Sequence, residues 1–275
     1  MTDQRSRRLI EPRSVFQVTA VNHISYGVSD VPRTRDFLMD VFGMNCVFDD
    51  GLRCSVAFGS PEHAIYIVPS RRPDKSAYVD HLAFSVANFD PKRSEETLKQ
   101  HGFHPEFDGD FAWTIEDPDG MRLQICAETG VFPGAALPGS TSEGKIPSGA
   151  AANRPGVFRT TAVNHIAYTV ADYARARDFY MDLLGMRIAF EDGLKCSVDF
   201  GEPPSALYLT KSRQPGGKFL IDHLAFSVAD FDLGDAEGKL KKLGLHPEDD
   251  GAHAWTIQDP DGYRIQVCAE RGVYP

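Results

Sequence analysis

The heptapeptide NHISYGV at residues 22–28 returns almost unchanged as NHIAYTV at residues 164–170. Each copy reads as a strand that opens with a polar residue and a histidine. The offset of 142 residues is the same from His81 to His223, within two copies of the segment DHLAFSV. A repeat of this length predicts two similar domains in a chain of 275 residues.

Two further motifs keep the same offset. DGLRCSVAFG begins at Asp50 and returns as DGLKCSVDFG, and DPDG begins at Asp117 and returns at Asp259. The stretch between the copies is rich in Gly, Pro, Ala and Ser, which is typical of a linker. We therefore expect an N-terminal arm over residues 1–17, a first domain over 18–131, a linker over 132–159 and a second domain over 160–275.

The composition indicates which partners to expect. Hydrophobic residues make up 42% of the chain and charged residues 25%, with no apolar run long enough to span a bilayer. The net charge of -10 disfavours nucleic acid and anionic membranes, and so favours a small-molecule partner. Five cysteines without CxxC spacing suggest neither disulfides nor a zinc finger. The N-terminus has no secretory h-region, so we expect a cytoplasmic protein.

Each copy is itself double. Both NHISYGVSD and DHLAFSVAN precede a helical stretch that ends near a glycine, and three short strand-like segments follow each helix. The sequence therefore predicts an α+β protein of four βαβββ units, two in each repeat.

The motifs NHI…V, DHLAFSV and DPDG…Q resemble those of the vicinal oxygen chelate superfamily. This superfamily includes glyoxalase I, extradiol ring-cleaving dioxygenases, fosfomycin-resistance proteins and bleomycin-binding proteins. The resemblance covers residues 18–131 and 160–273. It implies that each repeat forms an open, cup-shaped mixed sheet with helices outside and a divalent metal inside the cup. Four units in one chain resemble the extradiol dioxygenases of the catechol 2,3-dioxygenase type.

Two histidines in each repeat are the expected metal ligands. Side chains alternate along a strand, so His23 shares a face with Ser25, and His81 occupies the equivalent position in the next unit. The pairs His23 with His81 and His165 with His223 can therefore converge, and imidazoles suit Fe(II) or another divalent ion. The alternative is a histidine at the start of a strand that only bonds to neighbouring backbone.

The third expected ligand departs from the resembled family. Four residues after the glycine of DPDG the family usually carries glutamate, whereas this chain carries Gln124 and Gln266. A neutral amide oxygen can bind a metal, but it lacks the charge of a carboxylate. Glu128 and Glu270 lie too far along the strand for direct ligation and are expected at the rim. Cys126 and Cys268 are expected to be small buried residues rather than thiolate ligands.

Three further residues are catalytic candidates. Tyr66 and Tyr208 stand where glyoxalase-like members carry another carboxylate ligand, and each could hydrogen-bond a substrate oxygen or simply pack. His253 has no copy in the first repeat, where Phe111 stands, so an acid-base role would fall on the second repeat alone. His104 and His246 are expected at the surface, and Trp113 and Trp255 in the core or the cup wall.

The first functional hypothesis is an extradiol-type dioxygenase in which a catecholic or similar chelating substrate and O2 meet at Fe(II). Zinc, manganese or nickel are alternative ions. The second hypothesis is a glyoxalase-like lyase or isomerase with the metal as Lewis acid. The third is a non-enzymatic protein that binds a drug or another small molecule. We expect a monomer or a homodimer.

Overall fold

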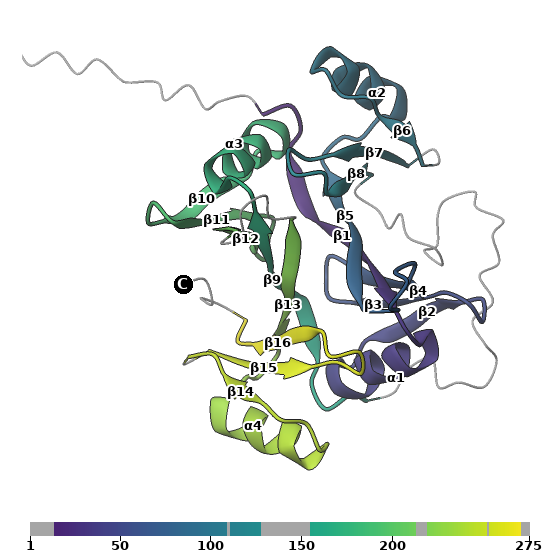
Figure 1. Ribbon diagram of the computed structural model, residues 1–275, viewed down its shortest axis with the longest axis vertical. Helices are drawn as coiled ribbons and strands as arrows, with labels where there is room; N and C mark the ends of the chain where they lie inside the picture. The colour runs from purple at the N-terminus through teal and green to yellow at the C-terminus, as the bar shows by residue number, and fades with distance from the viewer. Residues whose placement is uncertain (1–13, 109–110, 128–154, 213–218, 252, 271–275) are drawn as a thin grey trace, which may run out of the picture.

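The computed structural model describes residues 14–108, 111–127, 155–212, 219–251 and 253–270. Within these ranges the chain forms two eight-stranded open sheets and four helices (Figure 1). This arrangement confirms the α+β class and the four βαβββ units. The expected arm before residue 14 and the expected linker before residue 155 lie outside the described ranges. Among the described helices, none combines the length and the apolar character needed to cross a membrane.

The elements of the first repeat are β1 (Val18–Val28), α1 (Val31–Phe42), β2 (Asn45–Asp49), β3 (Cys54–Phe58), β4 (His63–Pro69), β5 (Tyr78–Val86), α2 (Pro91–Gln100), β6 (Glu106–Phe107), β7 (Ala112–Glu116) and β8 (Arg122–Cys126). The elements of the second repeat are β9 (Thr160–Val170), α3 (Tyr173–Leu184), β10 (Arg187–Glu191), β11 (Lys195–Phe200), β12 (Ser205–Lys211), β13 (Leu220–Val228), α4 (Leu233–Lys242), β14 (Glu248–Asp249), β15 (Ala254–Gln258) and β16 (Arg264–Cys268).

The first strand of each unit lies at the centre of its sheet. The strand order is β2-β3-β4-β1-β5-β8-β7-β6 in the first repeat, and the second repeat has the equivalent order. β1 runs parallel to β4 and antiparallel to β5, so the two units of one repeat join along β1 and β5. The histidines of both units therefore lie on neighbouring central strands.

Short polar caps explain where the helices begin. The Asp30 side chain accepts a hydrogen bond from the Arg33 N–H ahead of α1, and Asp90, Asp172 and Asp232 cap the other three helices in the same way. Helix α1 ends at Gly43, whose φ of 63° is a left-handed conformation that glycine adopts without steric cost. These caps turn the chain from each central strand back across the sheet.

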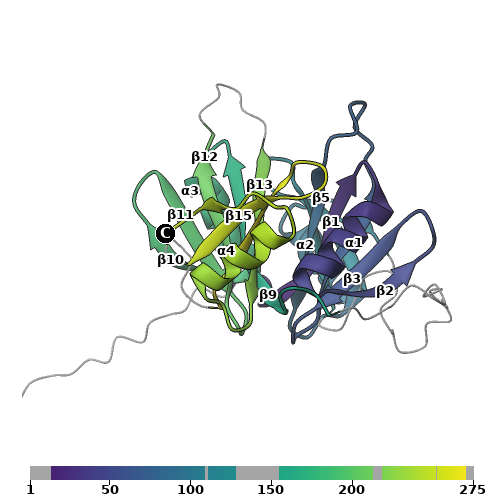
Figure 2. The ribbon, with the colours of Figure 1, turned by 90° about the horizontal axis from the view of Figure 1, so that it is seen from below.

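The two faces of each sheet differ in what they contact. The residues that alternate with the histidines on β1, such as Ile24 and Tyr26, lie in one continuous core that draws on both repeats. Aromatic contacts cross this core, with ring centroids 5.3 Å apart for Phe42 and Phe226. Figure 2 shows the two repeats side by side. The face that carries His23, which we call the cup face, points away from the shared core.

Backbone hydrogen bonds also join each repeat to the C-terminal end of the other repeat's first helix. The Val15 N–H donates to the Asp182 carbonyl at 2.9 Å, and the Val157 N–H donates to the Asp40 carbonyl at 2.9 Å. The segments just before β1 and β9 thus run along the last turn of the opposite repeat's first helix. The junction has approximate two-fold symmetry, as expected for a duplicated unit.

The DPDG loops make buried polar contacts between the repeats. Tyr168 and Tyr180 donate their hydroxyls to the Asp117 carboxylate at 2.8 and 2.9 Å, and Tyr26 donates to Asp259 at 2.6 Å. Burial raises the pKa of Asp117 above its ordinary value. These loops, which we call the DPDG clasps, join the repeats through buried hydrogen bonds.

Candidate metal site

The structure brings the two histidines of each repeat together. On the paired strands β1 and β5, Ser25 lies opposite His81 and His23 lies opposite Ala83, so the two histidines are diagonal neighbours on the cup face. Their Nε2 atoms are 3.0 Å apart, and the Nε2 atoms of His165 and His223 are also 3.0 Å apart. The rings meet edge to face, with an interplanar angle of 81° in the first repeat.

The other ring nitrogens are fixed by the residues just before them. His23 Nδ1 lies 2.9 Å from Asn22 Oδ1, and His81 Nδ1 lies 3.0 Å from Asp80 Oδ2. The Asn22 amide donates its Nδ2 to Ser85 Oγ at 3.0 Å, so its oxygen faces the ring. Because both oxygens can only accept, each Nδ1 carries the proton and each Nε2 presents a lone pair. The same contacts recur in the second repeat.

The two Nε2 atoms of each pair, 3.0 Å apart, are close enough for both to bind one metal ion. Burial, and secondarily the charge of His223, lower the pKa of His165 to about 3, and burial lowers the pKa of His23 well below its ordinary value. These imidazoles are therefore neutral near pH 7, and uptake of a proton is unfavourable. Neutral, hydrogen-bonded imidazoles with converging Nε2 atoms suit a divalent metal ion. Metal ligation itself remains a prediction.

Gln124 lies in the same cross-strand row as His23. His23 is opposite Ala83, and Ala83 is opposite Gln124 on β8, so only a small side chain separates the two along the cup face. The Gln124 Nε2 donates to the Asp108 carboxylate, and Gln266 donates to Asp250 in the same way. Since the amide nitrogen is used, the carbonyl oxygen is the atom left to meet a cation.

The carboxylates that contact the histidine pairs, Asp80 and Asp222, bond to Nδ1 of His81 and His223 and not to the paired Nε2 atoms. In the described part of the chain, no group of three or more His, Cys, Asp or Glu side chains is arranged so that it could hold a metal ion. Cys126 is buried near Gln124, and burial raises the pKa of its thiol, so it stays protonated. Cys268 behaves in the same way. Each cup therefore offers three neutral candidate ligands.

The tyrosines line the cup beside the histidines. Tyr66 on β4 is opposite Ser25, and Tyr208 on β12 is opposite Ala167. The Tyr208 ring centroid is 6.5 Å from that of His165, and Lys195 Nζ lies 5.4 Å from the Tyr208 ring centroid. Both tyrosines therefore lie on the cup face, on the strand next to the first histidine of each pair.

The remaining candidates lie outside the histidine pairs. His253 is exposed in the turn before β15, and its acid-base role stays a prediction. Trp113 donates its Nε1 to the Pro91 carbonyl at 2.7 Å, at the start of α2, which places it on the helix side of the sheet. Glu128 lies outside the described residues, and Glu270 is exposed beyond the end of β16.

Asn22, Asp80 and Asp108 have roles that the sequence reasoning missed. The first two could have been found, because a polar residue directly precedes each paired histidine in both repeats. Asp108 lies 16 residues before Gln124, and Asp250 lies 16 residues before Gln266, a spacing that matches neither the strand nor the helix period.

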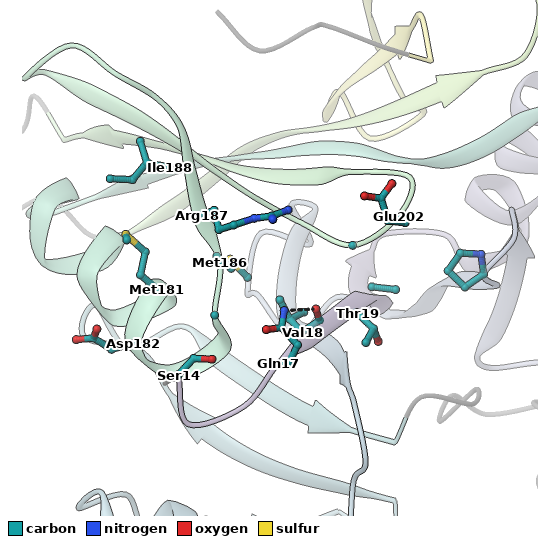
Figure 3. Close-up of a pocket in the computed structure, with 14 residues that line it drawn as sticks. Ser14, Gln17, Val18, Thr19, Met181, Asp182, Met186, Arg187, Ile188 and Glu202 are labelled. Carbon is teal, nitrogen blue, oxygen red and sulfur yellow. Dashed lines mark hydrogen bonds between the residues drawn. The ribbon is translucent and has the colours of Figure 1, made fainter. Parts of the chain in front are cut away.

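A cavity of about 880 Å³ lies elsewhere, at the junction of the two repeats (Figure 3). Its lining includes Val18, Met181, Met186, Arg187, Ile188 and Glu202. Figure 3 shows these side chains around the start of β1 and the turn after α3. Among the residues that the structure describes, this lining contains no histidine and none of the candidate ligands. The cavity is therefore separate from the cup faces.

Solved structures share the fold across most of the chain. The 2,3-dioxygenase LapB from Pseudomonas sp. KL28 aligns with a TM-score of 0.67 at 14% identity, covering 95% of each chain. The Mn(II)-bound glyoxalase from Novosphingobium aromaticivorans aligns with a TM-score of 0.66 at 18% identity, covering 93% of this chain and 83% of the other. At these identities the likeness establishes the fold.

Sequence comparison gives the family. A curated relative, the metallothiol transferase FosB from Staphylococcus haemolyticus (strain JCSC1435), is 32% identical over 81 residues, which are 29% of this chain and 58% of the relative. The family model described as Glyoxalase/Bleomycin resistance protein/Dioxygenase superfamily matches residues 20–125 and 162–267. The matches begin and end at nearly equivalent points of the two repeats and cover most of the chain. The chain therefore belongs to the Glyoxalase/Bleomycin resistance protein/Dioxygenase superfamily.

Proposed function

We propose that the chain is a metal-dependent, extradiol-type dioxygenase that acts on a catecholic or similar chelating small molecule. The observation that carries this proposal is the approach of two imidazole Nε2 atoms to 3.0 Å in both repeats. His23, His81 and Gln124 would hold the ion in the first cup, and His165, His223 and Gln266 in the second. Bound Fe(II) would supply open coordination positions for the substrate and O2, and the redox change that O2 chemistry needs.

The charge of the site favours an anionic chelating substrate. Because all three candidate ligands are neutral, a bound divalent ion keeps most of its charge toward the cup. A catechol that binds through two deprotonated oxygens would offset that charge, whereas a neutral ligand would not. Two of the similar structures are a 2,3-dioxygenase and a homoprotocatechuate 2,3-dioxygenase from Arthrobacter globiformis, the latter at 19% identity and a TM-score of 0.66.

The protein's own residues define the space for the substrate. The positions beside His23 on the neighbouring strands are Ala64 and Ala83, whose small side chains would leave the substrate access to the ion. The phenol of Tyr66 stands at the edge of this space, and burial raises its pKa, so it remains a hydrogen-bond donor at neutral pH. It would orient a substrate oxygen. Tyr208 would do the same in the second cup.

Oxygen consumption tests the proposal directly. The chain would be loaded with Fe(II) under anaerobic conditions and mixed with a panel of catechols, and O2 uptake and ring-cleavage products would be measured. We expect uptake with at least one catechol, and its loss when His23→Ala and His165→Ala are combined. Metal binding without O2 uptake by any catechol would contradict the proposal.

A glyoxalase-like lyase or isomerase is the second candidate, supported by the likeness to the Mn(II)-bound glyoxalase. Such chemistry needs a strong base near the metal. The carboxylates that contact the paired histidines, Asp80 and Asp222, are bonded at the Nδ1 atoms, away from the paired Nε2 atoms, which favours the dioxygenase. Turnover of a 2-oxoaldehyde thiol adduct without O2 uptake would instead favour the glyoxalase-like enzyme over the dioxygenase.

A further inference from the structure

Each cup places two carboxylates directly behind its neutral candidate ligands. Asp80 stands behind His81 and Asp108 stands behind Gln124, each one hydrogen bond away from the cup. We propose that these two aspartates supply the negative charge of the metal site through the ligands they contact. Asp222 and Asp250 would do so in the second repeat. This inference rests on the proposed function, because it concerns the same metal site.

Asp80 is anchored on both sides. Its Oδ2 atom accepts from His81 Nδ1 at 3.0 Å and from Arg122 Nη1 at 3.2 Å. The equivalent Asp222 accepts from His223 at 2.8 Å and from Arg264 at 2.7 Å. The arginine fixes the carboxylate, so the carboxylate fixes the ring. An anionic partner that accepts from Nδ1 also increases the electron density on Nε2, which makes Nε2 a stronger metal ligand.

The two histidines of a pair are held differently. His23 meets the neutral amide of Asn22, whereas His81 meets the carboxylate of Asp80. The same difference separates His165 from His223. If the preceding residue only fixed ring orientation, an amide would serve at both positions. The recurrence of one carboxylate per pair favours a role for its charge.

Asp108 acts on the third ligand. Its carboxylate accepts from Gln124 Nε2, which polarises the amide and increases the negative charge on its carbonyl oxygen. In the second repeat Asp250 accepts from Gln266 Nε2 and also from Thr256 Oγ1 at 3.2 Å. The negative charge that a glutamate ligand would place on the metal is therefore carried by Asp108 and Asp250, one hydrogen bond behind the glutamine ligands.

Aspartate-to-asparagine variants separate charge from position, because asparagine keeps the shape and an acceptor oxygen. One variant pairs Asp80→Asn with Asp222→Asn, and another pairs Asp108→Asn with Asp250→Asn, so that both cups change equally. Asp90→Asn with Asp232→Asn is the matched control, since these residues cap α2 and α4 and asparagine caps helices equally well. A gain-of-charge variant replaces Asn22 and Asn164 with aspartate.

The readouts are Zn(II) and Co(II) affinity, by competition with a chromophoric chelator, and the absorption spectrum of the Co(II) form. Thermal unfolding of the metal-free proteins confirms that each variant folds. We expect each of the first two variants to bind metal about 10- to 100-fold more weakly, with the control unchanged. The asparagine-to-aspartate variant should bind more tightly and shift the Co(II) spectrum.

Affinities within about twofold of the parent chain for folded variants would overturn the inference and show that the aspartates only position the ligands. Failure of the parent chain itself to bind Zn(II) or Co(II) would instead overturn the proposed function. The two failures are distinguishable, because the parent chain is measured in the same titration.

Discussion

Replacing the unusual glutamine by the family's glutamate should fail to strengthen metal binding unless the aspartate behind it is also changed. The substitution Gln124→Glu, made together with Gln266→Glu, places a carboxylate directly on the ion. However, glutamate has no N–H to donate to Asp108, which now accepts from Gln124 Nε2. Two carboxylates would then meet at hydrogen-bond distance.

The repulsion between the new glutamate and Asp108 is large enough to offset the metal affinity that the extra negative charge would add. Two unit charges about 4 Å apart at an effective dielectric constant of about 20 repel by about 4 kcal/mol. Such a pair relieves the repulsion by sharing a proton, which removes the charge that the glutamate was meant to add. We therefore expect the glutamate variant to bind Zn(II) within about tenfold of the parent chain.

Adding Asp108→Asn and Asp250→Asn to the glutamate variant should remove the repulsion, so that the new glutamates can strengthen metal binding. The asparagine amide can donate to the new glutamate and carries no charge, so the combined variant should bind Zn(II) about 10- to 100-fold more tightly than the parent. The asparagine change alone is expected to weaken binding, so the double-mutant cycle should show a coupling of at least about 1 kcal/mol. Additive effects in competition titrations would refute the reasoning.

Three other outcomes are expected. The chain should bind two divalent ions, and His165→Ala should leave one; saturation at one ion by the parent chain would show that the cups are not equivalent. In the metal-free protein burial holds the pKa of His165 at about 3, against 6.5 for an exposed histidine, so the unfolded chain takes up a proton first as the pH falls. Stability should therefore decrease below pH 6.5, on the order of 1 kcal/mol per pH unit for this histidine, and urea unfolding at pH 7 and pH 5 should show a smaller decrease for His165→Ala. Tyr180→Phe removes a buried hydroxyl that donates to Asp117 at 2.9 Å and should cost about 1.5–3 kcal/mol; an unchanged unfolding free energy would mean that this hydrogen bond adds nothing.

The fold could be predicted from the sequence because its signals are local and repeated. The offset of 142 residues identified the two repeats, and the alternation of strand, helix and three strands identified the units within them. The approach of His23 to His81 followed from their equivalent positions on central strands. A constant spacing thus carried information about three-dimensional position.

The contacts that the sequence left hidden join residues whose spacing matches no strand or helix period, although the repeat duplicates them. Asp108 reaches Gln124 from a neighbouring hairpin, and the carboxylate of Asp117 reaches hydroxyls of the other repeat. Both aspartates lie in polar turns, where aspartate is common for local reasons. Their tertiary roles therefore could not be separated from turn preference by pattern alone.

The position of the DPDG clasps also bears on why two repeats share one chain. In the first repeat the clasp at Asp117 lies between β7 and β8, and β8 carries Gln124 only seven residues later. The Asp117 side chain accepts from the N–H of Met121 at 2.9 Å, directly before β8, and from Tyr168 of the other repeat at 2.8 Å. The second repeat thus holds the entry of the strand that presents the first repeat's third ligand, and Asp259 makes the reciprocal contact with Tyr26. We therefore expect the geometry of each cup to respond to changes in the opposite repeat, although all of its candidate ligands come from one repeat.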